Sequence, residues 1–226
     1  MKNKGPGILF WLIAIFVTAS PAGRAQVNDA GLWTDFTLEK KISKDLDFIF
    51  TQQTRFNENI TEVGTFYFEA GPEYRFFKGF KAGLFYRFIN KRRLDDSYSQ
   101  GHRIYLDLSY RKKIRRFQAG YRIRFQIQYM DYRKSETGSV PSWDIRQKIH
   151  FQYNTKSRFD PYLDGEIWYN INPVRSQFDN LRICTGIVTR ITKNHFIDTG
   201  YILQKEFNVV NPETDYIVYL GYKISL

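Results

Sequence analysis

Charged side chains at alternating positions are the residues of this 226-residue chain whose chemistry most needs an explanation. Arg122 and Arg124 flank a single apolar residue, and Arg103 and Arg111 lie in the segment before them. Because successive side chains of a strand point to opposite sides, residues two apart share one face. We interpret this charged face as the lining of an enclosed lumen, formed by Arg75, Arg87, Arg103, Arg111, Arg122, Arg124, Arg146, Glu69, Glu73, Asp107, Asp164 and Glu166.

Such a face allows two interpretations, and the sequence leaves both open. The arginines could pair with the Asp and Glu side chains and simply fill the lumen, or they could line a path that selects anions. The set cannot form a dry core, because burying even one unpaired charge costs several kcal/mol. The opposite, apolar face must therefore meet either lipid or a second sheet.

Side chains that could catalyse a reaction lack a recognisable arrangement. Ser99 lies near His102, but no G-x-S-x-G motif surrounds it. Glu69 and Glu73 would share a face roughly 13 Å apart, at about 3.3 Å per residue, which is too far for the carboxylate pair of a glycosidase. We expect a non-enzymatic protein, with an outer-membrane lipid-modifying enzyme as an alternative.

Metal and cofactor chemistry is not indicated either. His102, His150 and His195 lie in separate segments without the spacing of metal ligands. Cys184 is the single cysteine, so no internal disulfide can form. We expect no metal site and no cofactor.

The elements that position these residues are short segments in which apolar and polar residues alternate. The clearest is 117–129, where seven apolar positions alternate with six polar or glycine positions. No stretch of convincing helical period occurs. The alternating segments are 31–42, 46–56, 66–75, 80–88, 103–111, 117–129, 143–153, 161–169, 181–191, 197–206 and 216–226.

Short turns alternate with longer polar connections between these segments, which is typical of barrels in the outer membrane. In hydrocarbon every backbone N–H and C=O must be paired within the protein, and a closed barrel satisfies this. We predict an all-β fold, a single antiparallel transmembrane β-barrel of about 10–12 strands with short periplasmic turns and longer extracellular loops. Since single-chain barrels usually have even strand numbers, the eleven segments suggest either a twelfth short strand at 27–30 or one segment outside the wall.

The first 25 residues read as a cleaved signal peptide, which leaves 26–226 as the barrel domain. Lys2 and Lys4 precede the apolar run 8–19, and small residues up to Ala25 suit a signal peptidase. Cleavage would also remove Arg24 and lower the net charge from +11 to +8. Export argues against nucleic acid as a partner. The excess of basic residues fits solvated loops, a basic lumen or contact with anionic lipid head groups.

The segment 216–226 carries a continuous apolar face bounded by tyrosines, of a length that suits a tilted strand crossing a bilayer. We expect outer-membrane lipid against this face and recognition of this C-terminal strand by the outer-membrane assembly machinery. The oligomeric state is not predicted by these residues.

Short motifs give the chain a family resemblance. They are Gly31-Leu32-Trp33, Gln53-Thr54-Arg55-Phe56, Gly71-Pro72-Glu73-Tyr74-Arg75, and Gly101-His102-Arg103 leading into Tyr105-Leu106-Asp107. With them the chain resembles a Gram-negative outer-membrane β-barrel family catalogued as a domain of unknown function. The resemblance implies an outer-membrane location and a barrel, and it carries over no reaction and no catalytic residue.

Gly31-Leu32-Trp33 also fits the G-x-W opening of lipocalins, so a soluble ligand-binding barrel is a further alternative. The interpretation we state first is a porin-like outer-membrane protein, a narrow pore or conduit for small anionic solutes. A barrel of this size can also be filled by its own side chains.

Overall fold

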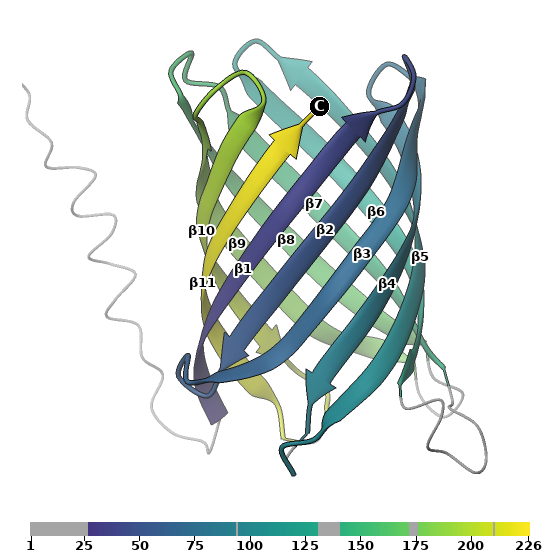
Figure 1. The fold of residues 1–226 in the computed structure, drawn as a ribbon, viewed down its shortest axis with the longest axis vertical. Helices are drawn as coiled ribbons and strands as arrows, with labels where there is room; N and C mark the ends of the chain where they lie inside the picture. The colour runs from purple at the N-terminus through teal and green to yellow at the C-terminus, as the bar shows by residue number, and fades with distance from the viewer. Residues whose placement is uncertain (1–26, 94, 131–140, 172–175, 210) are drawn as a thin grey trace, which may run out of the picture.

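A computed structural model describes residues 27–93, 95–130, 141–171, 176–209 and 211–226. The predicted signal peptide, 1–25, lies outside these residues. Eleven strands form one closed barrel (Figure 1). They are β1 (Val27–Lys41), β2 (Leu46–Asn57), β3 (Glu62–Phe77), β4 (Phe80–Arg92), β5 (Tyr98–Ile114), β6 (Phe117–Met130), β7 (Ser142–Tyr153), β8 (Phe159–Ile171), β9 (Gln177–Arg190), β10 (His195–Glu206) and β11 (Glu213–Ser225).

Each strand pairs with its neighbours in sequence in antiparallel fashion, and the barrel closes where β1 meets β11. This closing pair is parallel, with Trp33 opposite Tyr219 and Asp35 opposite Gly221. An odd number of strands becomes possible because β1 and β11 run in the same direction. Both alternatives expected from an even count are therefore wrong: 27–30 is the start of β1, and all eleven predicted segments belong to the wall.

The two ends of the barrel differ in their connections. The connections 42–45, 78–79, 115–116, 154–158 and 191–194 lie at one end, drawn at the top of Figure 1 together with the end of β11. The strand ends that the connections 58–61, 93–97, 131–141, 172–176 and 207–212 join lie at the other end, where β1 begins. We call these the short-turn end and the long-loop end. Among the described residues, no helix is long and apolar enough to cross a membrane.

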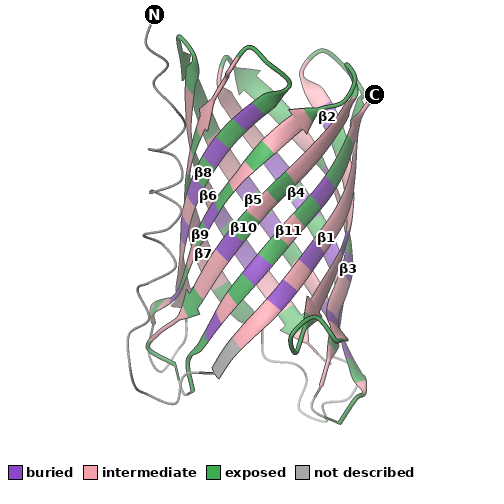
Figure 2. Cartoon of the chain, turned by 90° about the vertical axis from the view of Figure 1, so that its left-hand side faces the viewer, coloured by how far each residue is buried: buried purple, intermediate pink, exposed green. Residues whose placement is uncertain are grey.

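Burial alternates along the strands, as the exposed and buried bands of Figure 2 show. Leu84, Leu106 and Val218 are exposed on the outside of the barrel, whereas Tyr105 and Glu166 are buried inside it. The apolar side of the alternating pattern therefore faces outward and the charged side faces inward. A lipocalin-like barrel would place apolar side chains around its ligand, so this arrangement argues against that alternative.

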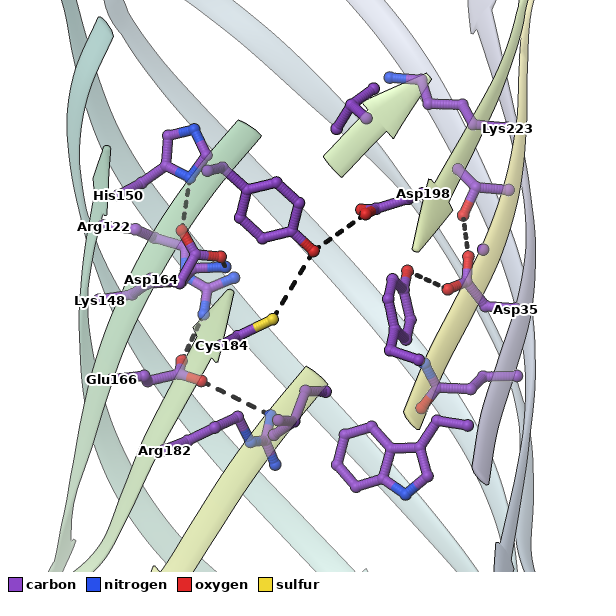
Figure 3. Close-up of a pocket in the computed structure, with 18 of the residues that line it drawn as sticks. Asp35, Arg122, Lys148, His150, Asp164, Glu166, Arg182, Cys184, Asp198 and Lys223 are labelled. Carbon is purple, nitrogen blue, oxygen red and sulfur yellow. Dashed lines mark hydrogen bonds and ion pairs between the residues drawn. The ribbon is translucent and has the colours of Figure 1, made fainter. Parts of the chain in front are cut away.

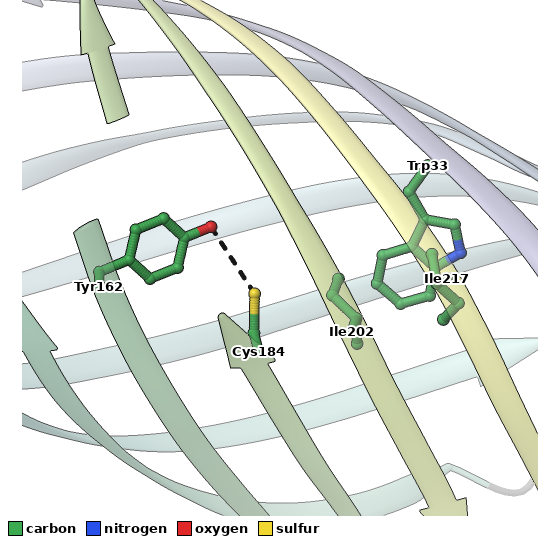
Figure 4. Packing of buried hydrophobic residues seen from close by; sticks show 5 residues of the cluster. All are labelled: Trp33, Tyr162, Cys184, Ile202 and Ile217. Carbon is green, nitrogen blue, oxygen red and sulfur yellow. Dashed lines mark hydrogen bonds between the residues drawn. The ribbon is translucent and has the colours of Figure 1, made fainter. Parts of the chain in front are cut away.

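A small hydrophobic cluster fills part of the lumen on the side of β8 to β11 and β1 (Figure 4). It consists of Trp33, Tyr162, Cys184, Ile202 and Ile217, of which Ile217 is only 1% exposed. Tyr162 can lie across the wall because Gly186 has no side chain: a Cβ there would stand 2.6 Å from the Tyr162 hydroxyl. The cluster therefore narrows this part of the lumen with uncharged side chains.

Candidate functional site

Arginine and aromatic side chains alternate around the middle of the lumen. The Arg55 guanidinium carbon lies 3.8 Å from the ring centre of Trp33, that of Arg87 lies 3.7 Å from Tyr67, and that of Arg124 lies 3.6 Å from Tyr105. A guanidinium over an aromatic face is attracted by the ring quadrupole, and it is held flat. We call this the arginine–aromatic ring; its members are Trp33, Arg55, Tyr67, Arg87, Tyr105, Arg124, Arg146, Trp168 and Arg182.

Strand pairing brings the ring together, because each of β1 to β9 contributes one member. Trp33 stands opposite Arg55 in the register of β1 and β2, and Arg146 stands opposite Trp168 in that of β7 and β8. Arg182 closes the ring: its guanidinium carbon lies 4.8 Å from the ring centres of both Trp33 and Trp168. The stacking therefore continues from β9 to β1 past β10 and β11, which contribute no member.

Three carboxylates hold part of the ring by ion pairs. Glu69 accepts from Arg87 at 2.5 Å, and Asp107 accepts two hydrogen bonds from Arg124, both at 2.7 Å. Glu166 accepts from Arg146 at 2.7 Å and from Arg122 at 2.5 Å. Paired, hydrogen-bonded charges of this kind can be buried at a far lower cost in free energy than single ones.

Other arginines at this level have neutral partners. Arg55 donates to the side-chain oxygen of Gln53 at 2.6 Å, and Arg103 donates to that of Gln128 at 2.8 Å. Among the described residues, no carboxylate lies within ion-pair distance of either. The middle of the lumen therefore carries more guanidinium than carboxylate charge.

The ring separates two chambers of the lumen. One, of about 750 Å³, opens toward the short-turn end, and another, of about 370 Å³, opens toward the long-loop end. Arg55, Arg146 and Arg182 line both chambers, so they stand between them. A smaller cavity of about 230 Å³ lies beside the first, against β3 to β6. A solute that crossed the barrel would have to pass these guanidinium groups.

The larger chamber holds ion pairs on one side and carboxylates bound by tyrosine hydroxyls on the other (Figure 3). On one side Asp164 pairs with Lys148 at 2.6 Å and with His150 at 2.5 Å. On the other side Asp35 accepts from the Tyr219 hydroxyl, and Asp198 accepts from the Tyr162 hydroxyl at 2.9 Å. The two carboxylates flank Gly221 in the strand register, and the Tyr219 hydroxyl lies over this glycine, where a Cβ would stand 2.7 Å from it.

Most of the residues predicted for the lumen are brought together by the structure. The charged clusters unite Glu69 with Arg87, Asp107 with Arg122 and Arg124, and Glu166 with Arg122 and Arg146. The cavities are lined by all of the predicted residues but one, namely Arg87, Arg103, Arg111, Arg122, Arg124, Arg146, Glu69, Glu73, Asp107, Asp164 and Glu166. Arg75 is exposed at the short-turn end and lines none of these three cavities.

The predicted set omitted the aromatic half of the ring. Trp33, Tyr67, Tyr105 and Trp168 lie on the charged face, and each has a carboxylate two residues away on the same face. That spacing, an aromatic residue beside Asp or Glu on the polar side of a strand, is the signal that could have found them.

The residues considered for catalysis do not meet. Ser99 is buried on the inside of β5, whereas His102 contacts the Tyr86 hydroxyl on the outside. His195 bonds the hydroxyl of Tyr222, another outward residue. Within the described part of the chain, no group of three or more His, Cys, Asp or Glu side chains could hold a metal ion.

A family model matches the chain in sequence, and a solved structure is similar to it in fold. The model of a family described as "Protein of unknown function (DUF2490)" matches residues 30–214. No curated protein matches. Among solved structures, the chain is similar to the "Beta Domain of the Bordetella Autotransporter Brka", with 12% identity and a TM-score of 0.54, over 82% of this chain and 86% of that one. At this identity the likeness shows the fold alone, that of an autotransporter β-domain.

Proposed function

The chain belongs to the family described as Protein of unknown function (DUF2490), and we propose that it is an outer-membrane barrel whose lumen conducts small anions through the arginine–aromatic ring. An outer-membrane location is supported by the fold, by the apolar outer face and by the predicted signal peptide. Lipid covers the outer face in this proposal, and the short-turn end faces the periplasm.

The observation that carries the proposal is the surplus of guanidinium charge where the two chambers meet. Arg55 and Arg103 lack carboxylate partners in the described structure, and Arg55 lies on the boundary between the chambers. Charge at a constriction controls which ions pass, because field lines are concentrated there by the low-dielectric wall. Ion pairs elsewhere in the lumen cancel and contribute little to selectivity.

Stacking against an aromatic face gives Arg55 a second property. Its guanidinium lies over the Trp33 ring and donates to Gln53, and its remaining N–H donors can meet a passing anion. The binding stays weak enough for release, because one or two charge-assisted hydrogen bonds replace part of the ion's hydration shell. The path therefore suits chloride, phosphate or small carboxylates.

Planar-bilayer recordings of the refolded protein under a KCl gradient test this proposal. We expect a small conductance whose reversal potential shows preference for the anion. Arg55→Gln and Arg103→Gln should each shift the reversal potential toward cations, since neither change leaves a carboxylate unpaired. Arg75→Gln, which removes an exposed arginine outside the cavities, is the matched control. The proposal fails if the protein does not conduct, prefers cations, or responds equally to all three substitutions.

A further inference from the structure

The chamber at the long-loop end contains uncompensated charges of both signs. On one side, Arg55 and Arg103 donate to glutamine side chains rather than to carboxylates. They lie on β2 and β5, and their guanidinium groups form part of the lining of this chamber of about 370 Å³. An anionic group entering here would meet donors that lack a charged partner in the described structure.

Carboxylates line the other side of the same chamber. Asp179 lies on β9 and Glu206 on β10, and only β11 and β1 separate β10 from β2, the strand of Arg55. Within the described part of the chain neither forms an ion pair, and Asp144 nearby accepts only from the amides of Gln126 and Asn170. In the described structure the two arginines and these carboxylates therefore bind neutral amide side chains or no side chain, and not each other.

Among the described residues, two buried polar atoms of the lining have no hydrogen-bond partner. They are the indole N–H of Trp168 and the side-chain oxygen of Asn180, whose residue is only 4% exposed. An unsatisfied buried donor or acceptor costs about 1–3 kcal/mol, and such groups are rare without a functional reason. Trp168 and Asn180 stand opposite each other in the register of β8 and β9. A free donor and a free acceptor therefore lie side by side.

We propose that this chamber binds a small zwitterion in which a carboxylate and an ammonium group share one carbon, as in a free α-amino acid. The carboxylate would accept from Arg103, Arg55 and the Trp168 N–H. The ammonium would donate to the Asn180 oxygen and to the carboxylates of Asp179 and Glu206. A solute that carries opposite charges on neighbouring groups can bind both the unpaired donors and the unpaired acceptors of the chamber. A simple anion would bind the donors and leave the acceptors unsatisfied.

This inference goes beyond anion conduction and does not depend on it. Binding needs only the chamber on one side of the ring, and it can be measured without any current. A barrel that conducts nothing could still hold the zwitterion, and a conducting barrel could lack the site.

Fluorine NMR of the detergent-solubilised barrel labelled with 5-fluorotryptophan tests the site. The Trp168 resonance, assigned with Trp168→Phe, should move on addition of L-alanine, while Trp143 on the outer face should not respond. Propionate and ethylamine carry only one charge each. We expect both to shift Trp168 at concentrations roughly tenfold higher than alanine, a difference of about 1.4 kcal/mol.

Substitutions separate the two halves of the site. Arg103→Gln should weaken the response to alanine and to propionate by at least roughly tenfold. Glu206→Gln should weaken the response to alanine but leave or strengthen that to propionate. Arg75→Gln, at the other end of the barrel, should change neither. A response to propionate at or below the alanine concentration would reduce the site to an anion site and overturn the proposal, as would no response to alanine at all.

Discussion

Removing the charge of Glu166 should destabilise the barrel more than any change of a surface carboxylate. Glu166 is 5% exposed and accepts hydrogen bonds from Arg122 and Arg146, with Arg182 at 3.7 Å. In Glu166→Gln, three guanidinium groups would share an amide oxygen in place of a carboxylate. The substitution keeps the shape of the side chain, so packing changes little.

The expected size of the effect follows from these contacts. Breaking a buried ion cluster by removing one partner costs about 3–5 kcal/mol. The two chambers give the freed guanidinium groups some access to water, so we expect the lower limit, about 3 kcal/mol. The same change increases the positive charge of the constriction, and the reversal potential of a conducting barrel should shift further toward anions.

Urea unfolding of the protein refolded into phospholipid vesicles, followed by tryptophan fluorescence, measures the change in midpoint and slope. The matched control is Glu58→Gln, because Glu58 also pairs with an arginine, Arg92, at 2.8 Å but is 61% exposed. A surface pair contributes little, so its midpoint should stay at the wild-type value. If the two variants have equal midpoints, Glu166 does not hold the ring as described.

Two further substitutions test the outer face and the wall. Leu106→Arg places a charge on the exposed face at the centre of β5 and should reduce stability in vesicles by about 2–4 kcal/mol. The control, Leu106→Phe, should be tolerated. Equal yields of folded protein from the two variants would show that lipid does not cover this face. Gly71→Ala should cost about 1–3 kcal/mol, because its Cβ would stand 2.1 Å from the Leu84 carbonyl oxygen. Gly165→Ala, whose closest contact would be 3.4 Å to a side chain, is the control, and a matching loss of thermal stability in both variants would contradict the argument.

Alternation along single strands was enough to predict the barrel and its two faces. Segment 117–129 shows why: its polar and apolar positions separate cleanly, and the structure places Arg122 and Arg124 inside and Phe125 outside. The parallel closure of β1 on β11 was not predictable in this way. It depends on which strands become neighbours, and periodicity within one strand contains no information on its partners.

The contacts that close the arginine–aromatic ring could not be predicted from the sequence for a related reason. Arg182 contacts Trp33 although the two residues are far apart in the chain and belong to strands that are not paired. Their meeting depends on the tilt and register of the whole barrel. The charged face suggested ion pairs, which do occur, but the predicted lining comprised only Arg, Asp and Glu side chains and no aromatic partner of the arginines.

The parallel pairing of β1 and β11 also determines at which end of the barrel β1 begins and at which end β11 ends. An odd number of crossings carries a polypeptide from one side of a bilayer to the other, so in the proposed location Val27 and Ser225 lie at opposite sides of the membrane. During insertion the strands cannot all enter as self-contained hairpins, because one of the eleven has to traverse the membrane without a hairpin partner. The parallel pairing therefore predicts that the two termini of the barrel lie on opposite sides of the membrane, which reporter groups fused to them would reveal directly.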